Sequence, residues 1–574
     1  MKKGYTIALI IAIIVLALFT TSYFIFYNNK NTSTAEVTEY NEEDYNHDFS
    51  NYKIVEVNLN EVDSIYKITK GGVYSFTGTL EGYIDINTTD YVKIIINNVT
   101  IKNSGPCIYN ENSKGLYIEL NGENNLSDTS NYTSFDEEVN STIYSKDDLI
   151  IEGDGTLNIT SNYNDSIASK DDLVIKSGTY NITSTDDSIR GKDKVIILDG
   201  TFNIKAGGDG IKTTNEADTD KGYILIKDGT FNIESTNDAL DAITNITIEN
   251  GTFNLTTGGG SSIKSTSSTW GMWNQSNTTS TTQSAKGIKA GNNITINNIN
   301  LTANTSDDAI HSNNNIDINN GNIEIKSGDD GIHADNAITI NNGTINITQS
   351  YEGIEANNVT INNGNIKVSA TDDGININGG NDNSAKNRQG ANTYSSNSSN
   401  NMLTINGGTV YVNSSGDGLD SNGSITITGG YTTVDGPTDN GNGALDYDGS
   451  FTITGGTLIA AGSSGMMQNA SSGTTQNTTL IYFTNTQNAN TTVSVGDISY
   501  TPSKNYSCIL ISSPELETGK EYTVSIDNNT YTTYTQSNTV TTVGQGNSIG
   551  MMPGGNMPNE QQAGYPQEGG QRRR

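Results

Sequence analysis

The sequence predicts an all-β solenoid, a parallel β-helix with a single chain and about 22 residues in each coil. The first observation is a short acidic phrase that recurs through the middle of the chain and ends each time in Ile or Leu. These residues follow one another at a basic step of 22, which lengthens where loops are inserted: Ile167, Ile189, Ile211, Leu240, Ile263, Ile288, Ile310, Ile332, Ile354, Ile375, Leu419 and Leu445. A repeat of this length indicates a solenoid.

The second observation is the periodicity of strands within each repeat. A glycine turn is followed by apolar residues that alternate with Thr and Asn, as in residues 199–204, 250–255 and 342–347. Such alternation is typical of strands. The repeats contain no helical stripe of ten residues, and Leu is too sparse for a leucine-rich repeat. We therefore expect three short strands per coil, with coils stacked about 4.8 Å apart and inward Ile, Val and Leu forming apolar files.

Charge and cysteine content limit the partners. The 574 residues include 64 Asp and Glu against 31 Lys and Arg, a formal net charge of −33. This charge argues against nucleic acid as a partner and favours cations or a neutral ligand. Two cysteines, Cys107 and Cys508, are too few for a disulfide framework and are expected to be incidental thiols.

The N-terminus predicts a membrane anchor. Lys2 and Lys3 precede an uncharged apolar run, residues 7–27, which is long enough to cross a bilayer. The basic flank would stay inside the cell and place the remainder outside. An uncleaved single-pass anchor with an extracellular C-terminal portion is favoured, and secretion after signal cleavage is the alternative.

Composition divides the chain into five parts. We expect an anchor over residues 1–30, a linker over 31–51, the β-helix over 52–461, a β cap over 462–545 and a disordered tail over 546–574. The irregular start and the β cap would cover the open ends of the solenoid.

Stacked coils would place equivalent carboxylates directly above one another. Two positions before the Ile or Leu of each repeat, an acidic file is expected that includes Asp165, Asp187, Asp209, Asp308, Asp330 and Asp373. Carboxylates about 4.8 Å apart repel by about 1 kcal/mol in water and by more near a protein surface. Clustered oxygen ligands suit Ca²⁺, which would neutralise them. The alternative is that each Asp forms a turn by accepting hydrogen bonds from nearby amides.

A file of cations is expected one position after each Ile or Leu, pointing outward. Its members are Arg190, Lys212, Lys264 and Lys289. They could bind the carboxylates of an acidic sugar, or they could neutralise the neighbouring acids. His311 and His333 occupy the same file, where a solvated outer position is favoured over a role as metal ligands.

The only two tryptophans, Trp270 and Trp273, lie in an inserted loop, residues 264–285. Exposed aromatic rings stack on the apolar face of a sugar ring. We therefore predict that both bind polysaccharide; the alternative is that they cover a face of the solenoid.

Several phrases resemble a known family. Residues 123–128, 145–149, 169–173, 187–193 and 207–212 are similar to phrases of the carbohydrate-binding, pectate-lyase-like parallel β-helix family of clostridial cell surfaces. The resemblance covers residues 52–461. It implies a right-handed β-helix with bound calcium, and binding of cellulose and acidic plant polysaccharides. Asp165, Asp187 and Asp209 fall inside the matching phrases and are the calcium ligands that the resemblance suggests.

We therefore expect a cell-surface protein without catalytic residues that binds cellulose, polygalacturonate or both on a calcium-stabilised β-helix. A calcium-dependent pectate-type lyase is one alternative, with Arg190 beside Asp187 as its only obvious base. A surface spacer or adhesin without a sugar ligand is another.

Overall fold

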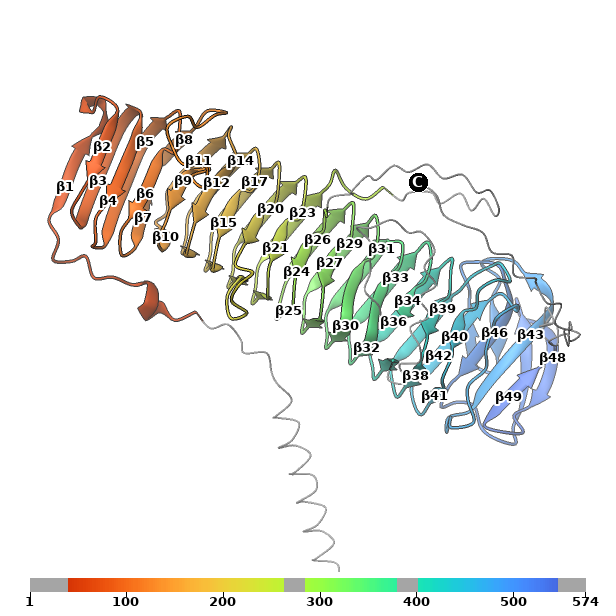
Figure 1. Ribbon diagram of the computed structural model, residues 1–574. Coiled ribbons are helices and arrows are strands. Elements are labelled where there is room, and N and C mark those ends of the chain that lie inside the picture. The colour runs from red at the N-terminus through yellow and green to blue at the C-terminus, as the bar shows by residue number, and fades with distance from the viewer. Residues whose placement is uncertain (1–39, 263–283, 379–400, 546–574) are drawn as a thin grey trace, which may run out of the picture.

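The described chain is a long rod of stacked strands (Figure 1). The computed structural model describes residues 40–262, 284–378 and 401–545. Apart from two short 3₁₀ helices, η1 (Glu42–Tyr45) and η2 (Leu59–Glu61), the regular elements in these residues are all strands. The prediction of an all-β chain is confirmed.

Three ladders of parallel strands run along the rod, and each coil contributes to all three. Ladder A consists of β2 (Ile65–Ile68), β4 (Tyr83–Asn87), β6 (Ile108–Asn112), β9 (Ser141–Ser145), β12 (Asp165–Ser169), β15 (Ile189–Gly191), β18 (Ile211–Thr213), β21 (Leu240–Ala242), β24 (Ile288–Ala290), β27 (Ile310–Ser312), β30 (Ile332–Ile340), β32 (Ile354–Ile361), β34 (Ile375–Ile377), β37 (Leu419–Ser421) and β40 (Leu445–Tyr447). Ladder B consists of β1 (Ile54–Asn58), β3 (Gly72–Glu81), β5 (Val92–Lys102), β7 (Leu116–Asn121), β10 (Leu149–Glu152), β13 (Asp172–Ile175), β16 (Lys194–Ile197), β19 (Tyr223–Ile226), β22 (Ile246–Ile248), β25 (Asn293–Ile296), β28 (Asn315–Ile318), the second halves of β30 and β32, β35 (Met402–Ile405), β38 (Ser424–Ile427) and β41 (Phe451–Ile453).

Ladder C begins with the second halves of β3 and β5. It continues through β8 (Glu123–Ser127), β11 (Thr156–Ser161), β14 (Thr179–Ser184), β17 (Thr201–Ala206), β20 (Thr230–Ser235), β23 (Thr252–Thr257), β26 (Asn300–Thr305), β29 (Asn322–Ser327), β31 (Thr344–Gln349), β33 (Asn365–Ala370), β36 (Thr409–Ser414), β39 (Tyr431–Asp435) and β42 (Thr457–Gly462).

The register between strands matches the repeat in the sequence. Ile167 lies opposite Ile189, and Ile189 lies opposite Ile211, so one coil takes 22 residues where no loop intervenes. This winding is the one that a parallel β-helix has. Its right-handed sense stays a prediction.

The predicted register is wrong at one place. Leu240 pairs with Ile288 and not with Ile263, so no coil separates β21 from β24. Ile263 lies outside the described residues. The sequence was ambiguous here because Gly260-Ser261-Ser262 imitates the phrase that precedes each true repeat residue.

The core is built from files of inward residues. On ladder C, Tyr180, Phe202, Phe231 and Phe253 are fully buried and stack with ring centroids 4.9, 4.8 and 4.5 Å apart. These distances match the spacing between neighbouring strands, because each coil adds one ring to the stack. Both cysteines are buried free thiols, as expected.

The C-terminal end of the solenoid is covered by antiparallel strands. β46 (Tyr506–Ser512) pairs antiparallel with β42 and also with β43 (Thr478–Gln487), which in turn pairs with β49 (Val540–Val543). A second sheet contains β45 (Ile498–Tyr500), β44 (Val493–Val495), β47 (Glu521–Ile526) and β48 (Asn529–Thr535). The last parallel strand of ladder C, β42, is thereby protected from an open edge.

The structure contradicts the expected single-pass membrane location. Within the three described ranges, no helix is long and apolar enough to span a bilayer. The two 3₁₀ helices there have 4 and 3 residues, whereas a crossing needs about 20. The run on which the expectation rested, residues 7–27, lies outside the described residues.

Candidate functional site

The outer side of ladder A carries the two charged files that the repeat predicts. The first file consists of the acids two positions before the Ile or Leu of each repeat. The second file consists of the residues one position after that Ile or Leu. Side chains of the two files meet because the loop into ladder A brings residues three apart together. Lys212 Nζ donates to Asp209 Oδ2 at 2.5 Å, and His311 Nδ1 lies 2.9 Å from Asp308 Oδ2.

In the N-terminal half of ladder A, the predicted sugar-binding cations neutralise the acids. Arg190 Nη2 lies 2.7 Å from Asp165 Oδ2, and Lys289 Nζ lies 2.9 Å from Asp238 Oδ2. Lys212 also lies 3.7 Å from Asp187 Oδ2. Arg190, Lys212 and Lys289 thus take the second of the two roles that the sequence left open for them.

Burial still weakens these acids. It raises the pKa of Asp165 to about 7 and of Asp209 to about 6, while Arg190 and Lys212 act in the opposite direction. The cations therefore offset only part of the cost of taking the carboxylates out of water.

One lysine stands in the acidic file itself. Lys286 occupies the position of an Asp, is only 4% exposed, and places Nζ 2.9 Å from Asp307 Oδ1 and 2.7 Å from Asp308 Oδ2. Asp308, predicted as a calcium ligand, is thus bonded to a buried cation. The neighbouring carboxylates raise the pKa of Lys286, so that it stays charged.

The expected solvated position of the two histidines is wrong. His333 is 1% exposed, and the two rings stack with centroids 4.9 Å apart. His333 Nδ1 lies 3.2 Å from Asp330 Oδ2 and 3.0 Å from Glu355 Oε2. These acids, with Asp335, raise the pKa of His333 far above its usual value, because they stabilise the imidazolium. The acidic turn beside this outward-pointing file covers it. Strand alternation predicts that a side chain points outward, but it does not show whether a neighbouring turn buries that side chain.

The last coils of ladder A differ, because four of their acids have no Lys or Arg partner in the described part of the chain. Among the described residues, no Lys or Arg forms an ion pair with Asp373, Asp417, Asp420 or Asp446. Carboxylate oxygens of the last three lie within 4.8 Å of one another. Burial and mutual repulsion raise the pKa of Asp373 to about 7, of Asp417 to about 6 and of Asp420 to about 8.

A neutral oxygen in this group lacks a partner. Asn376 lies between Glu355 and Asp420 in the same file, and its Nδ2 donates to Glu352 Oε2 at 2.8 Å. Its Oδ1 is buried without a hydrogen-bond partner. A buried amide oxygen is costly to leave unpaired, and it is a good ligand for a hard cation. The clustered carboxylates of Asp417, Asp420 and Asp446 could therefore hold Ca²⁺, with Asp373 and Asn376 on the preceding coil as further candidate ligands.

Three predicted sugar-binding residues are not placed. Trp270, Trp273 and Lys264 lie outside the described residues.

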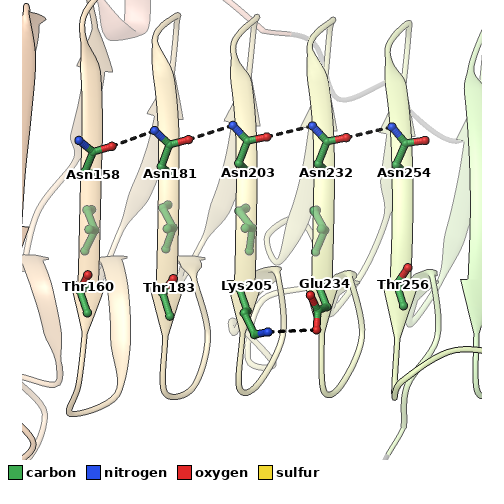
Figure 2. Close-up of a pocket in the computed structure, with 14 residues that line it drawn as sticks. Asn158, Thr160, Asn181, Thr183, Asn203, Lys205, Asn232, Glu234, Asn254 and Thr256 are labelled. Atoms are coloured by element: carbon green, nitrogen blue, oxygen red, sulfur yellow. Dashed lines mark hydrogen bonds and ion pairs between the residues drawn. The ribbon is translucent and has the colours of Figure 1, made fainter.

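A shallow groove of about 510 Å³ runs along the outer face of ladder C (Figure 2). It crosses β11, β14, β17, β20 and β23, so its length is about four strand spacings, or about 19 Å. One rim is a row of asparagines and the other is formed by Thr160, Thr183, Lys205, Glu234 and Thr256. The groove arises because the residue between the rims on each strand is an Ile or Leu that turns into the core.

The asparagine rim is a continuous hydrogen-bonded ladder. Each Nδ2 donates to Oδ1 of the preceding coil at 2.8 to 3.0 Å, through Asn158, Asn181, Asn203, Asn232 and Asn254 (Figure 2). A carboxamide has two N–H donors and an oxygen with two lone pairs. Asn181, Asn203 and Asn232 therefore each keep one donor and one acceptor free, held in a fixed orientation by their neighbours. Asn158 keeps no free donor, because its Nδ2 donates both to Asn125 Oδ1 and to Glu123 Oε1.

The groove is almost neutral in a strongly acidic chain. Its two charged lining residues, Lys205 and Glu234, pair with each other at 3.3 Å. Sequence reasoning missed this site. The sequence does contain a signal for it: in successive repeats, an Asn stands three positions after the glycine of the turn. In the sequence analysis this Asn was used only as evidence for strand periodicity.

These features lie within a region shared with known proteins. A family model described as carbohydrate-binding domain-containing protein matches residues 62–331 and 333–441, more than half of the chain. The chain belongs to this family. The match takes in the whole groove and the charged files as far as Asp420, and it confirms the predicted resemblance at the level of a carbohydrate-binding family.

Two further proteins are similar to this member of the carbohydrate-binding family. A carbohydrate-binding domain-containing protein of Acetivibrio thermocellus is 33% identical over 153 residues, which cover 23% of this chain and 52% of that protein. The chain thus spans about half the length of this relative. A solved structure, described as that of the polysaccharide lyase-like protein from C. thermocellum in a gadolinium derivative, is 30% identical; the match covers 36% of this chain and 91% of that chain, with a TM-score of 0.34.

Proposed function

We propose that this chain binds an extended, uncharged polysaccharide of the cellulose type in the groove on ladder C, with the glycan running along the solenoid axis. The asparagine ladder carries this proposal. Sugar hydroxyls both donate and accept hydrogen bonds, and the ladder offers one free donor and one free acceptor at each of its three middle coils, at Asn181, Asn203 and Asn232. Membership in a carbohydrate-binding family supports the same function.

The direction of the glycan follows from the direction of the ladder. The amides repeat along the axis of the solenoid, so a straight glycan laid along the groove meets a hydrogen-bonding group at each coil that it crosses. The amides are already oriented by their mutual hydrogen bonds, so binding orders few side chains and loses little conformational entropy.

The test replaces two adjacent rungs. Asn203→Ala with Asn232→Ala should weaken binding of a soluble cello-oligosaccharide roughly tenfold or more in calorimetric titration, since each neutral hydrogen bond contributes about 0.5–1.5 kcal/mol.

The matched control is a second asparagine ladder outside the groove. Asn319 donates to Asn297, and Asn341 donates to Asn319, with the same geometry on a different corner of the coil. Asn319→Ala with Asn341→Ala should leave binding unchanged. Equal affinity of the groove variant and the parent would show that the first ladder is structural only.

Calcium is proposed as a structural partner, held by Asp373, Asn376, Asp417, Asp420 and Asp446. The partly buried acids without a cation among the described residues and the unpaired amide oxygen of Asn376 support this assignment. A bound Ca²⁺ would supply positive charge that these residues otherwise lack. The four other predicted ligands nearest the N-terminus, Asp165, Asp187, Asp209 and Asp308, already bond to Arg or Lys.

The proposed role is binding without catalysis. Arg190 is the candidate base of a lyase. Its guanidinium is held in place by Asp165 and by Asn140, because Nη2 donates to Asn140 Oδ1 at 2.8 Å. Incubation with polygalacturonate and calcium should therefore give no absorbance of an unsaturated product; its appearance would instead support the lyase.

A further inference from the structure

The N-terminal end of the solenoid is open on two of its three sides. Among the strands that the structure describes, β1 pairs only with β3, and β2 pairs only with β4. One edge of each strand therefore faces away from the rod (Figure 1), with backbone N–H and C=O groups that no described strand meets. Ladder C is closed at this end, because Thr79 N donates to Asn60 Oδ1 at 3.1 Å. The first coil thus presents two unpaired strand edges, one from ladder A and one from ladder B.

The opposite end of the rod is covered by the chain itself. β46 pairs with β42, the last strand of ladder C. A loop bonds to β41, the last strand of ladder B, since Ser471 N donates to Phe451 O at 2.7 Å and Thr475 N donates to Ile453 O at 3.1 Å. These two strands have no free edge to offer, so a second copy could not continue the solenoid head to tail.

Apolar side chains gather at the open end. Seven large apolar side chains are exposed in the described part of the chain, and four of them lie here, with exposed fractions between 38% and 47%: Tyr52, Ile54, Val55 and Ile65. The end coil of a solenoid normally carries a polar outer face. An apolar end with unpaired strand edges is typical of a surface that another chain covers.

The first coil is electrically balanced, although the chain has a net charge of −33. Residues 53–70 contain three lysines and three acids: Lys53, Lys67, Lys70, Glu56, Glu61 and Asp63. Two strongly acidic surfaces would repel each other. Two copies of this coil can approach, because each carries both signs.

The segment that leads into the first coil does not cover the open end. Tyr40 stacks on Tyr45, whose hydroxyl donates to Asp172 Oδ2 on β13 at 2.8 Å. β13 is five strand spacings from β1 along ladder B, or about 24 Å. Residues 40–52 return from there along the side of the rod, where the Phe49 ring packs against β7. The described chain therefore reaches the first coil from the side.

The two open edges are complementary to each other. β1 carries Glu56 and β2 carries Lys67, and both side chains are exposed. If β1 of one chain pairs antiparallel with β2 of another so that Glu56 faces Lys67, Val57 falls opposite Tyr66. Val57 and Tyr66 both pack in the apolar core of their own chain. The same register thus places opposite charges together on the outer face and apolar side chains together on the inner face.

We propose that the open end is an interface at which two copies of this chain meet head to head. A two-fold axis through the corner between ladders A and B places β1 of each copy on β2 of the other, so both open edges are paired at once. The axis reverses the strand direction, which makes the new pairs antiparallel. The interface lies outside the groove on ladder C and does not depend on the proposed function.

The test reverses charges at the interface in the full chain. Sedimentation of the parent at micromolar concentration should give twice the mass of one chain. Glu56→Lys alone, or Lys67→Glu alone, puts like charges together at both β1–β2 contacts and should raise the dissociation constant of the dimer about tenfold or more. A chain with both substitutions restores the two opposite-charge pairs and should dimerise as the parent does.

Mixing the two single variants gives a sharper result. When a Glu56→Lys chain meets a Lys67→Glu chain, opposite charges face each other at both contacts. The mixture should therefore form a heterodimer, although each variant alone dimerises poorly. The control is Lys520→Glu, which reverses an exposed lysine in the C-terminal cap and should leave dimerisation unchanged.

Three results would overturn the proposal: a parent that stays monomeric at every concentration, single variants that dimerise as the parent does, or a mixture that does not associate. Hydrogen exchange identifies the other occupant in the first case. A monomeric parent with protected amides in β1 and β2 would show that another segment of the same chain covers the end. Loss of glycan binding in the groove variant has no bearing on these outcomes.

Discussion

Calcium should raise the melting temperature of the full-length chain, and the increase should be larger at pH 8 than at pH 5. Without metal, Asp373 and Asp420 have pKa values of about 7 and about 8 in the folded state, against 3.8 as the ordinary value. The folded state therefore binds protons more tightly than the unfolded state, and stability falls as pH rises from about 4 to about 8. Calcium binds the ionised carboxylates and reverses this loss.

The expected effect is large. A carboxyl whose pKa rises from 3.8 to about 7 on folding lowers the free energy of unfolding by roughly 4 kcal/mol once it is fully ionised, although the values for neighbouring acids are not additive. Free calcium at 100 times its Kd would add about 2.7 kcal/mol to the free energy of unfolding. Thermal melts at both pH values, with calcium and with chelator, measure the two contributions.

Two substitutions separate the proposed site from the other acids. Asp420→Asn should stabilise the calcium-free chain at pH 8, because it removes a buried charge, and should reduce the gain from calcium. Asp209→Asn, which removes the partner of Lys212, should destabilise the chain but keep that gain. Identical melting temperatures with calcium and chelator at pH 8 would refute the calcium site.

Lys286→Met should lower the free energy of unfolding by about 3–5 kcal/mol, the cost of removing one partner from a buried ion pair. The substitution leaves Asp307 and Asp308 without their cation, and Asp308 is fully buried. Denaturant unfolding of the full chain measures the change. Adding Asp308→Asn to the same chain should recover part of the loss, because it removes the uncompensated carboxylate.

The control for this substitution is an exposed ion pair in the same solenoid. Lys205 and Glu234 pair at 3.3 Å, with 68% and 64% of their side chains exposed. Lys205→Met should therefore cost at most about 1 kcal/mol. If Lys286→Met costs no more than Lys205→Met, the buried network does not stabilise the fold.

The sequence by itself determined the coil. The spacing of Ile167, Ile189 and Ile211 predicts both the 22-residue winding and the register of ladder A. It did so because a β-helix repeats one local pattern, so that periodicity in the chain becomes stacking in space. The error at Ile263 occurred where an inserted segment imitates that pattern, and only strand pairing resolves it.

Which charges meet was decided by the tertiary structure. The sequence placed Asp165, Asp209 and Asp308 in one file with Asp373, but it could not show that Arg190, Lys212 and Lys286 reach the first three and that no described cation reaches the last. Ion pairing depends on side-chain direction and burial, which a repeat does not encode. The asparagine groove likewise exists only because residues about 22 positions apart in the chain lie one strand spacing apart in space.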